Sequence, residues 1–352
     1  MTMRQLHTGL GWAVGLWLAL LCLSGSVLLF QYDLLRWQYP QLEHVDIATR
    51  PADWAQVLQQ LQQAQQYQYV RLPTDAAPWL EALTLQGSRH YMDVHGQPLL
   101  QRNPHADWID WVYDFHTSLL LGHNGSYLLG AIGVLSILML ITGLSHWWPA
   151  RMDSTVWQLK RSRNRLRNWR QWHSVPGVLI APLLLVLIFS GIVQVFSTPL
   201  RTLLGPTASL APPALPRAHQ HPLQATDWFR ALTAAQQAVP EGEIRFISLR
   251  QRAEQPIKLR KRNPGEWHPN GRSVLYIAPD DGTILTYRPA TDLPTARQFI
   301  NLMFPIHTAA VGGVLYVTLA GLAGLLGAGL FLTGVMYFIT RKRFRRATGG
   351  RC

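Results

Sequence analysis

The sequence predicts an α-helical membrane protein, with four transmembrane helices in two repeated halves and two α+β modules outside the membrane. Three observations favour this fold class. Only 14% of the 352 residues are charged and 48% are hydrophobic, whereas an ordinary soluble domain carries about 25% charged residues. Four stretches free of Asp, Glu, Lys and Arg are each long enough to cross a bilayer, which takes about 20 residues. Histidine and glycine recur at matching positions in these stretches, which indicates an internal duplication.

The four apolar stretches cover about residues 10–30, 119–148, 175–196 and 309–339. The first lies near the amino terminus, as a signal peptide would, but it lacks a clear small-x-small cleavage site. We therefore interpret it as an uncleaved anchor. The high hydrophobic fraction excludes a disordered chain. The low density of charge argues against a nucleic-acid-binding protein, which spreads Lys and Arg over a solvated face.

Basic residues gather in three short segments. The linker 150–172 holds seven Lys or Arg and one acid, the tail after Thr340 holds six and no acid, and the amino-terminal stub contributes Arg4. The positive-inside rule predicts that these segments, and with them both termini, are cytoplasmic. They carry the whole net charge of +13, whereas the first outer loop has −5 and the second +5. The tryptophans of the linker favour contact with the anionic surface of the bilayer.

This orientation places the two long loops in the periplasm of a bacterium whose inner membrane the helices cross. The predicted segments are 1–31 (stub and first helix), 32–115 (first module), 116–149 (second helix), 150–172 (basic linker), 173–197 (third helix), 198–304 (second module), 305–340 (fourth helix) and 341–352 (basic tail).

The duplication is clearest in the second and fourth stretches, which align without a gap. Both contain the pattern H-T-x4-G-x7-G-x2-G-x8-T-G, at residues 116–143 and 307–334. In the first and third stretches, His7 and His173 are each followed eighteen residues later by the glycine of a Ser-Gly pair. Each half therefore contains a helix, an outer module and a second helix. Glycines on the histidine-bearing face let a partner helix or a flat cofactor approach closely.

Each outer loop has the pattern of a small α+β module. A helix-like stretch comes first, and strand-like pieces separated by a polar turn with glycine follow, which is typical of a hairpin. The helix-like stretches are 54–67 and 226–238, and the strand-like pieces are 80–85, 91–100, 243–249 and 274–285. We expect one helix packed against an antiparallel sheet in each module.

Each apolar stretch has one histidine at its own start, and ionisable residues bordering a span are functional candidates by default. A helix rises about 1.5 Å per residue, so chain position sets depth. His7 and His173 then lie near the cytoplasmic face, and His116 and His307 near the outer face. Two such pairs fit bis-imidazole ligation of two haems in a helical bundle. Zinc fits less well, because it needs a third or fourth strong ligand. No Cys-x-x-Cys-His is present, so the haem is expected to be the non-covalent b type.

Other residues compete for functional roles. His123 and His146 are alternative ligands, but their repeat equivalents are Val314 and Tyr337, so the duplication does not support them. In the second loop, basic residues and a tryptophan could attract an anionic chelate, although a charge run is more often a solvated face. These candidate substrate residues are Lys258, Arg260, Lys261, Arg262 and Trp267.

In these motifs the chain resembles the PepSY-associated transmembrane proteins. That family includes iron-regulated inner-membrane proteins and ferric-siderophore reductases of the ferrioxamine-reductase type. The resembling segments are Arg4-x-x-His7 through Ser24-Gly25, Phe115-His116-Thr117 through Thr142-Gly143-Leu144, Trp147-Trp148-Pro149, Trp172-His173 through Ser190-Gly191, His307 through Thr333-Gly334, and the hairpins at Met92-Asp93 and Pro279-Asp280-Asp281-Gly282. The resemblance implies b-type haem in the bundle and reduction of periplasmic ferric complexes.

The expected activity is therefore a transmembrane ferric-chelate reductase. Electrons would enter at the cytoplasmic pair and leave through the outer pair to a ferric siderophore or another ferric chelate. The electron donor is not identified by the sequence, and no G-x-G-x-x-G fingerprint points to a nucleotide on this chain. Two alternatives stay open, a haem-bearing subunit for another periplasmic oxidoreductase and a non-enzymatic protein that interacts through its PepSY modules.

Overall fold

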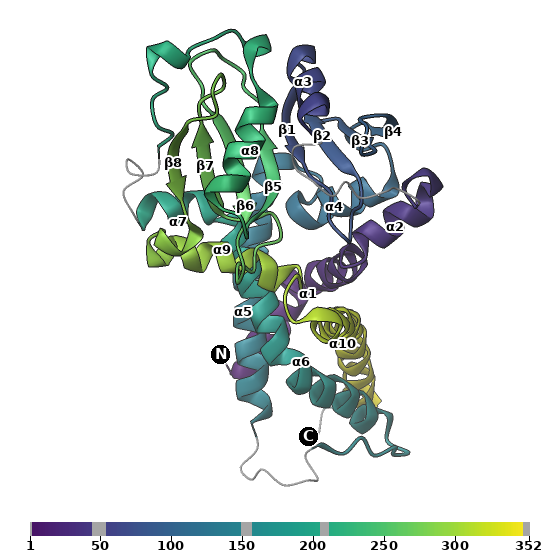
Figure 1. Ribbon diagram of the computed structural model, residues 1–352. Coiled ribbons are helices and arrows are strands. Elements are labelled where there is room, and N and C mark those ends of the chain that lie inside the picture. Colours follow the sequence, from purple (N-terminus) through teal and green to yellow (C-terminus); the bar gives the residue numbers. More distant parts are fainter. Residues whose placement is uncertain (1, 44–53, 149–156, 205–210, 348–352) are drawn as a thin grey trace. The chain divides into compact units, whose positions relative to one another are not determined.

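The computed structural model describes residues 2–43, 54–148, 157–204 and 211–347 (Figure 1). Parts of the basic linker and of the basic tail, including Arg151 and Arg351, lie outside the described residues. The chain divides into two compact units. The bundle unit comprises residues 1–30, 111–198 and 306–352, and the sheet unit comprises residues 31–110 and 199–305.

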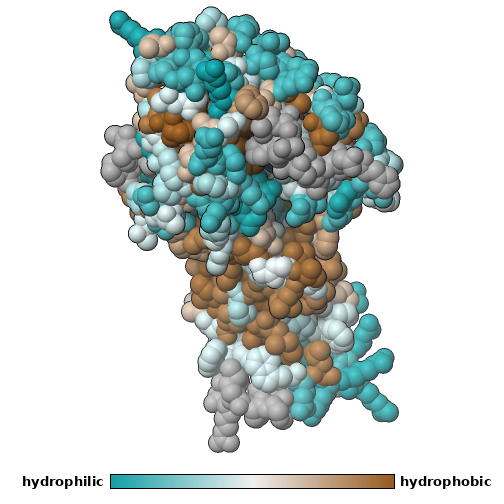
Figure 2. All heavy atoms as spheres, viewed as in Figure 1, coloured by the Kyte–Doolittle hydropathy of each residue, from teal (hydrophilic) through white to brown (hydrophobic). Residues whose placement is uncertain are grey.

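Four helices of the bundle unit are long and apolar enough to cross a membrane, which confirms the prediction of four spans. They are α1 (Met3–Leu28), α5 (Gly122–Trp147), α6 (Arg165–Val195) and α10 (Gly313–Ala347). The Thr2 side chain begins α1 with a capping box that includes Gln5. Large apolar side chains point away from the bundle interior, as in a protein solvated by lipid, and Figure 2 shows hydrophobic residues gathered over these helices.

The four long helices form a ring in which each packs against two neighbours, in the order α1, α5, α6, α10. Helix α1 is therefore diagonal to α6, and α5 is diagonal to α10. Glycines allow the close contacts between neighbours. A Cβ at Gly133 of α5 would meet the Ile192 side chain of α6 at 2.7 Å, and one at Gly324 of α10 would meet the backbone oxygen of Cys22 of α1 at 2.7 Å.

Two short helices precede the second and fourth spans, and the sequence pattern did not predict them as separate helices. Helix α4 (Trp108–Ser118) contains His116, and helix α9 (Thr295–His307) ends at His307. Both spans begin after a break with left-handed backbone, at Gly122 (φ 59°) and Gly313 (φ 58°). These are the first glycines of the repeated motif, and glycine adopts a positive φ without steric cost. The two histidines therefore lie just before the spans rather than within their first turns.

The sheet unit contains one antiparallel sheet of eight strands, in the order β4-β3-β2-β1-β5-β6-β7-β8. The strands are β1 (Tyr67–Arg71), β2 (Leu80–Thr84), β3 (Arg89–Met92), β4 (Pro98–Arg102), β5 (Glu243–Ser248), β6 (Ile257–Arg262), β7 (Ser273–Ile277) and β8 (Ile284–Arg288). The two modules contribute four strands each, and they join where Val70 of β1 pairs with Ile247 of β5. The modules thus share one continuous sheet.

The remaining helices of the described chain are short. They are α2 (Gln31–Gln38), η1 (Pro40–Leu42), α3 (Ala55–Ala64), α7 (Ser197–Leu203), η5 (Arg217–His219), η6 (Leu223–Ala225), α8 (Trp228–Ala238) and η7 (Ala290–Asp292). Four of them (α2, η1, α3 and α8) contribute to the apolar clusters on the sheet. Helices α3 and α8 cover one face, where Leu58, Leu232 and Leu259 lie in a shared apolar core. On the opposite face, a second apolar cluster around Trp79 and Tyr91 fills the first module only.

Candidate functional site

Two pairs of histidines meet inside the bundle unit. The ring centres of His7 and His173 are 6.1 Å apart, and those of His116 and His307 are 6.0 Å apart. The first pair comes from the diagonal helices α1 and α6, and the second from the segments that lead into the diagonal helices α5 and α10. Each pair therefore joins the two repeated halves across the middle of the ring. These are the partners that the sequence predicted, and their role as metal ligands stays a prediction.

Each of these rings is held by its Nδ1 atom. Nδ1 lies 2.9 Å from the carbonyl oxygen of Met139 in His7, of Leu330 in His173 and of Leu187 in His307. In His116 it lies 3.0 Å from the Ser24 hydroxyl, which itself donates to the Leu21 carbonyl. A carbonyl only accepts, so Nδ1 must carry the proton and donate. The other nitrogen, Nε2, is then an unprotonated lone-pair donor, which is the form that binds a metal.

Glycines of the repeated motifs seat these four rings. A Cβ at Gly143 would lie 2.9 Å from the Cε1 atom of His7, and one at Gly25 would lie 3.0 Å from that of His116. The second half repeats the arrangement, since Gly334 faces His173 at 3.1 Å and Gly191 faces His307 at 3.0 Å. Such contacts are tighter than a side chain tolerates without moving the ring. The sequence pattern suggested that these glycines contact a partner helix or a flat cofactor, whereas each contacts a histidine ring.

The residue before each of these glycines is Ser or Thr, and its hydroxyl contacts the histidine ring or the carbonyl that holds the ring. Ser190 Oγ lies 3.3 Å from His307 Nδ1, and Thr333 Oγ1 lies 3.3 Å from His173 Nδ1. Thr142 donates at 2.9 Å to the Met139 carbonyl, the same oxygen that accepts from His7. The Ser-Gly and Thr-Gly pairs of the duplication are therefore seats. Each consists of one hydroxyl, which contacts the ring or the carbonyl that holds it, and one glycine that makes room for the ring.

The pair geometry fits one metal ion between two imidazoles. If each Nε2 bonds the ion at about 2 Å, the two ring centres come to lie roughly 6 Å apart. Within the described ranges, the one group of three or more potential ligands is His219, Asp280 and Asp281, which is in the sheet unit. Each histidine pair therefore offers two ligands in an apolar setting, which suits the two axial positions of haem iron and not a tetrahedral zinc site.

The alternative ligands lie elsewhere on the bundle surface. His123 and His146 are both exposed. The His123 ring packs edge-on against Tyr127 at 4.8 Å. Neither shows the hydroxyl and glycine seat that holds the four paired histidines.

The candidate substrate residues divide between the two faces of the sheet. Lys258 and Arg260 alternate along β6 with Leu259, whose side chain is in the core under α3 and α8. Lys261 points toward that core and is fully buried. Its ammonium donates to the carbonyls of Ala235 (3.1 Å) and Val239 (2.6 Å) at the end of α8. Lys261 is thus a helix cap, not part of a solvated basic patch.

Buried Lys261 should make stability depend on pH. Burial lowers its pKa to about 8, below the ordinary value of about 10.4. Between these values the unfolded chain binds more protons than the folded one, so stability rises with pH over this window. We expect thermal unfolding to show this gain, roughly 3 kcal/mol at most, in the wild type and not in Lys261→Met. The exposed Lys160→Met is the control, and parallel curves for all three proteins would contradict the assignment.

Two histidines and two acids also come together in the sheet unit. His219 Nδ1 lies 2.8 Å from Asp280 Oδ1, and His221 Nε2 lies 3.3 Å from Asp280 Oδ2. The Asp281 carboxylate accepts hydrogen bonds from the backbone N–H and the hydroxyl of Thr283. His219 is a hydrogen-bond partner of Asp280, and His221 lies beside the same carboxylate. We therefore interpret the group as a structural contact that holds the β7–β8 hairpin.

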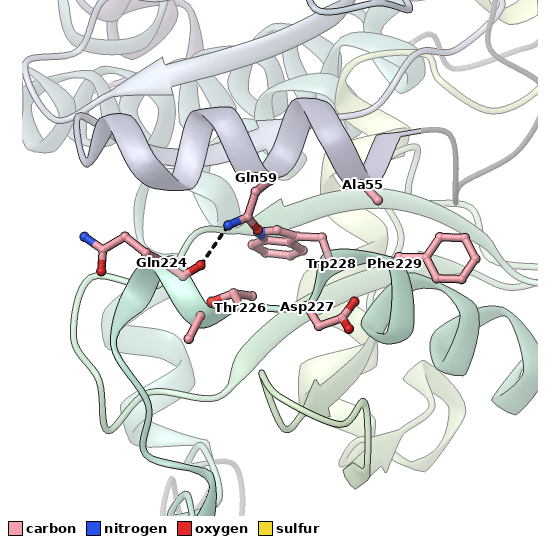
Figure 3. A pocket seen from close by; sticks show the side chains of 8 residues that line it. Ala55, Gln59, Gln224, Thr226, Asp227, Trp228 and Phe229 are labelled. Atoms are coloured by element: carbon pink, nitrogen blue, oxygen red, sulfur yellow. Dashed lines mark hydrogen bonds between the residues drawn. The ribbon is translucent and has the colours of Figure 1, made fainter.

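A shallow pocket lies where α3 of the first module meets the start of α8 (Figure 3). The Gln59 side chain donates at 2.8 Å to the Gln224 carbonyl, and Trp228 lies beneath α3. Asp227 caps α8 by accepting from the Arg230 backbone. No histidine, cysteine or cationic side chain lines this pocket. It is a seam between the modules rather than a second reactive site.

Comparison with known proteins agrees with this architecture. A search of curated proteins found no match. The family model described as the PepSY-associated TM region matches residues 4–341, nearly the whole chain. That range includes all four spans, both modules and the four paired histidines. The chain belongs to the PepSY-associated transmembrane family.

Proposed function

We propose that this protein carries electrons across the bacterial inner membrane through two b haems and reduces ferric chelates, such as ferric siderophores, in the periplasm. The observation that carries the proposal is the pair of neighbouring imidazoles near each end of the bundle. In both pairs Nδ1 is engaged by a hydrogen bond, and the ring separation of 6.0 to 6.1 Å suits one metal ion.

In this proposal the residues of the chain hold the four histidine rings in position and provide an apolar interior. The Met139, Leu330 and Leu187 carbonyls hold three of the rings in one tautomer, so the lone pairs are available without a change in protonation. Apolar side chains such as Leu18 and Ile132 pack together in the interior of the bundle. When bound, haem supplies the one-electron chemistry.

The basic linker and tail orient the protein, with His7 and His173 toward the cytoplasm. Each histidine of this pair lies eighteen residues from the Ser-Gly seat of an outer histidine, which is about 27 Å of helix. That length is close to the hydrocarbon thickness of a bilayer, about 30 Å. The two pairs thus suit entry and exit of electrons on opposite sides, with a donor that the chain does not identify.

Reduction itself needs little from the protein beyond electron delivery. One electron converts ferric to ferrous iron, and a donor on the cytoplasmic side restores that electron. The lower charge weakens the hold of hard oxygen ligands, so iron is released from the chelate. No proton transfer or covalent intermediate is required.

Absorption spectroscopy of the purified protein tests the proposal. We expect two haems per chain and a sharp low-spin α-band after dithionite reduction. Anaerobic addition of a ferric siderophore should then return the spectrum to the oxidised form. A protein without haem would contradict the proposal and favour the interaction protein. Haem that no ferric chelate re-oxidises would favour a subunit of another oxidoreductase.

A further inference from the structure

Cationic side chains cross the middle of the sheet on the face opposite α3 and α8. Arg71 of β1 pairs directly with Phe246 of β5, and Phe246 pairs directly with Arg260 of β6. Directly paired residues of antiparallel strands lie side by side on one face. Their neighbours Val70 and Leu259 are in the core under the helices, which fixes the row on the other face. One arginine comes from each module, so the row spans their junction.

Two further arginines join this row. Arg201 of α7 and Arg272, next to β7, are close enough to Arg260 for mutual repulsion. Burial, and then repulsion by Arg201, lowers the pKa of Arg260. Burial, and then repulsion by Arg260 and Arg201, lowers the pKa of Arg272 to about 9. Arg71, Arg201, Arg260 and Arg272 are all half-buried. Their charges are therefore partly removed from water but can still be reached by a ligand.

The carboxylates nearby do not balance these charges. Glu81 forms an ion pair with Arg71 at 2.9 Å. Glu266 accepts from the backbone of Arg272 and from the Ser273 hydroxyl, and its charge offsets part of the repulsion on Arg272. Arg201 and Arg260 form no hydrogen bond or ion pair with any residue that the structure describes; the Arg260 guanidinium lies over the Phe246 ring at 4.4 Å. The row therefore holds an excess of half-buried positive charge.

The excess of positive charge also affects His268, which lies beside these arginines. Its ring is buried against Phe304, with ring centres 4.8 Å apart. Burial, and then repulsion by Arg272 and the other arginines, lowers its pKa to about 2. His268 therefore stays neutral, and its Nε2 accepts from the Arg272 guanidinium at 2.7 Å. It orients one arginine without adding a charge, and the buried Nε of Arg272 has no hydrogen-bond partner in the described chain.

The first module has no such face. Strands β2 and β6 hold corresponding places on either side of the central pair of strands. In the same row, Glu81 of β2 pairs with Arg71 where Arg260 of β6 pairs with Phe246. Beyond Glu81, the face of the first module is filled by Trp79 and Tyr91. The two modules therefore differ on this face. In the first module it is filled by apolar side chains and a paired acid, and in the second it is cationic.

We propose that Arg71, Arg201, Arg260 and Arg272 form a binding site for a multiply charged oxyanion, a ligand with carboxylate or phosphate groups. Guanidinium groups bind such groups in a bidentate manner, and a half-buried cation without a counter-charge is unfavourable until an anion joins it. Two sources carry this chemistry, a soluble polycarboxylate and a phospholipid headgroup. The site stands whether or not the chain holds haem; if it does, an anionic ferric chelate such as ferric citrate is the corresponding substrate class.

Calorimetric titration of the full chain in lipid nanodiscs tests the site. With zwitterionic phosphatidylcholine, we expect citrate and inorganic phosphate to bind the wild type. Arg260→Gln and Arg201→Gln should each weaken that binding at least tenfold. Arg230→Gln, on the exposed face of α8, removes the same charge elsewhere and should bind as the wild type does. Competition by phosphatidylglycerol in a second nanodisc set would identify the lipid phosphate as the occupant, and no competition would identify the soluble anion.

Thermal unfolding gives a second readout that a misfolded variant cannot imitate. Without anion, Arg260→Gln should melt at or above the wild-type temperature, because it removes repulsion. Citrate should raise the melting temperature of the wild type and leave that of Arg260→Gln unchanged. Equal binding by both proteins would overturn the proposal. So would a wild type in which neither anion binds and phosphatidylglycerol changes nothing.

Discussion

Replacing His116 or His307 with alanine is expected to leave about half of the wild-type haem content. The centres of the two rings lie 6.0 Å apart, so under the proposed function either substitution would remove one of the two residues that hold the same haem. His7→Ala and His173→Ala should each remove the other haem. A pyridine haemochrome assay against protein concentration gives the stoichiometry.

Double substitutions separate the pairs from a general loss of folding. His116→Ala with His307→Ala should still retain half of the haem, since both act on one site. His7→Ala with His116→Ala should retain none. His123→Ala and His146→Ala are matched controls on exposed positions and should keep full content. Four single variants with full haem content would show that the ligands lie elsewhere.

Gly25→Val is expected to disable the outer pair without touching a ligand. The added Cβ would lie 3.0 Å from His116 Cε1, and the two further methyl groups of valine leave the ring no room in its seat. We expect about half of the haem to be lost, as in His116→Ala, or the remaining haem to show an altered low-spin EPR signal.

Gly11→Val provides the control in the same helix. A Cβ at Gly11 meets nothing within 4 Å, so this variant tests valine in α1 without displacing a histidine. Gly143→Val, in α5, makes the same test for His7, whose ring a Cβ at Gly143 would meet at 2.9 Å. Wild-type haem content and spectrum in Gly25→Val would contradict the seat.

The sequence could predict the spans and the histidine pairs because the signals for both are local. An apolar stretch predicts a helix. The duplication predicts that histidines at equivalent positions of the two halves lie at the same depth in the membrane. The break before each span was missed, since Leu119-Leu120 and Ala309 read as continuous apolar sequence. Only the backbone shows that the glycines at 122 and 313 adopt left-handed conformations.

The seats and the shared sheet could not be predicted, because both depend on contacts between distant segments. The sequence around Gly25 does not indicate that this glycine contacts His116. Strand β1 was not predicted, and only its first residue, Tyr67, falls in the predicted helix 54–67. Its partner β5 lies more than 170 residues away. The run Lys258–Arg262 was interpreted as one charged patch, whereas strand alternation sends Lys261 to the core.

The seats also bear on how the bundle assembles. Helix α1 supplies a histidine to one pair and the Gly25 seat to the other, and α5 supplies the Gly143 seat in return. Sliding one helix along the other by a single turn, about 5.4 Å, would empty both seats at once. The two helices of each half can therefore lock in only one longitudinal alignment. Cofactor loading at either end would report on the alignment of the whole half, and defective insertion into the membrane would appear first as the simultaneous loss of both sites.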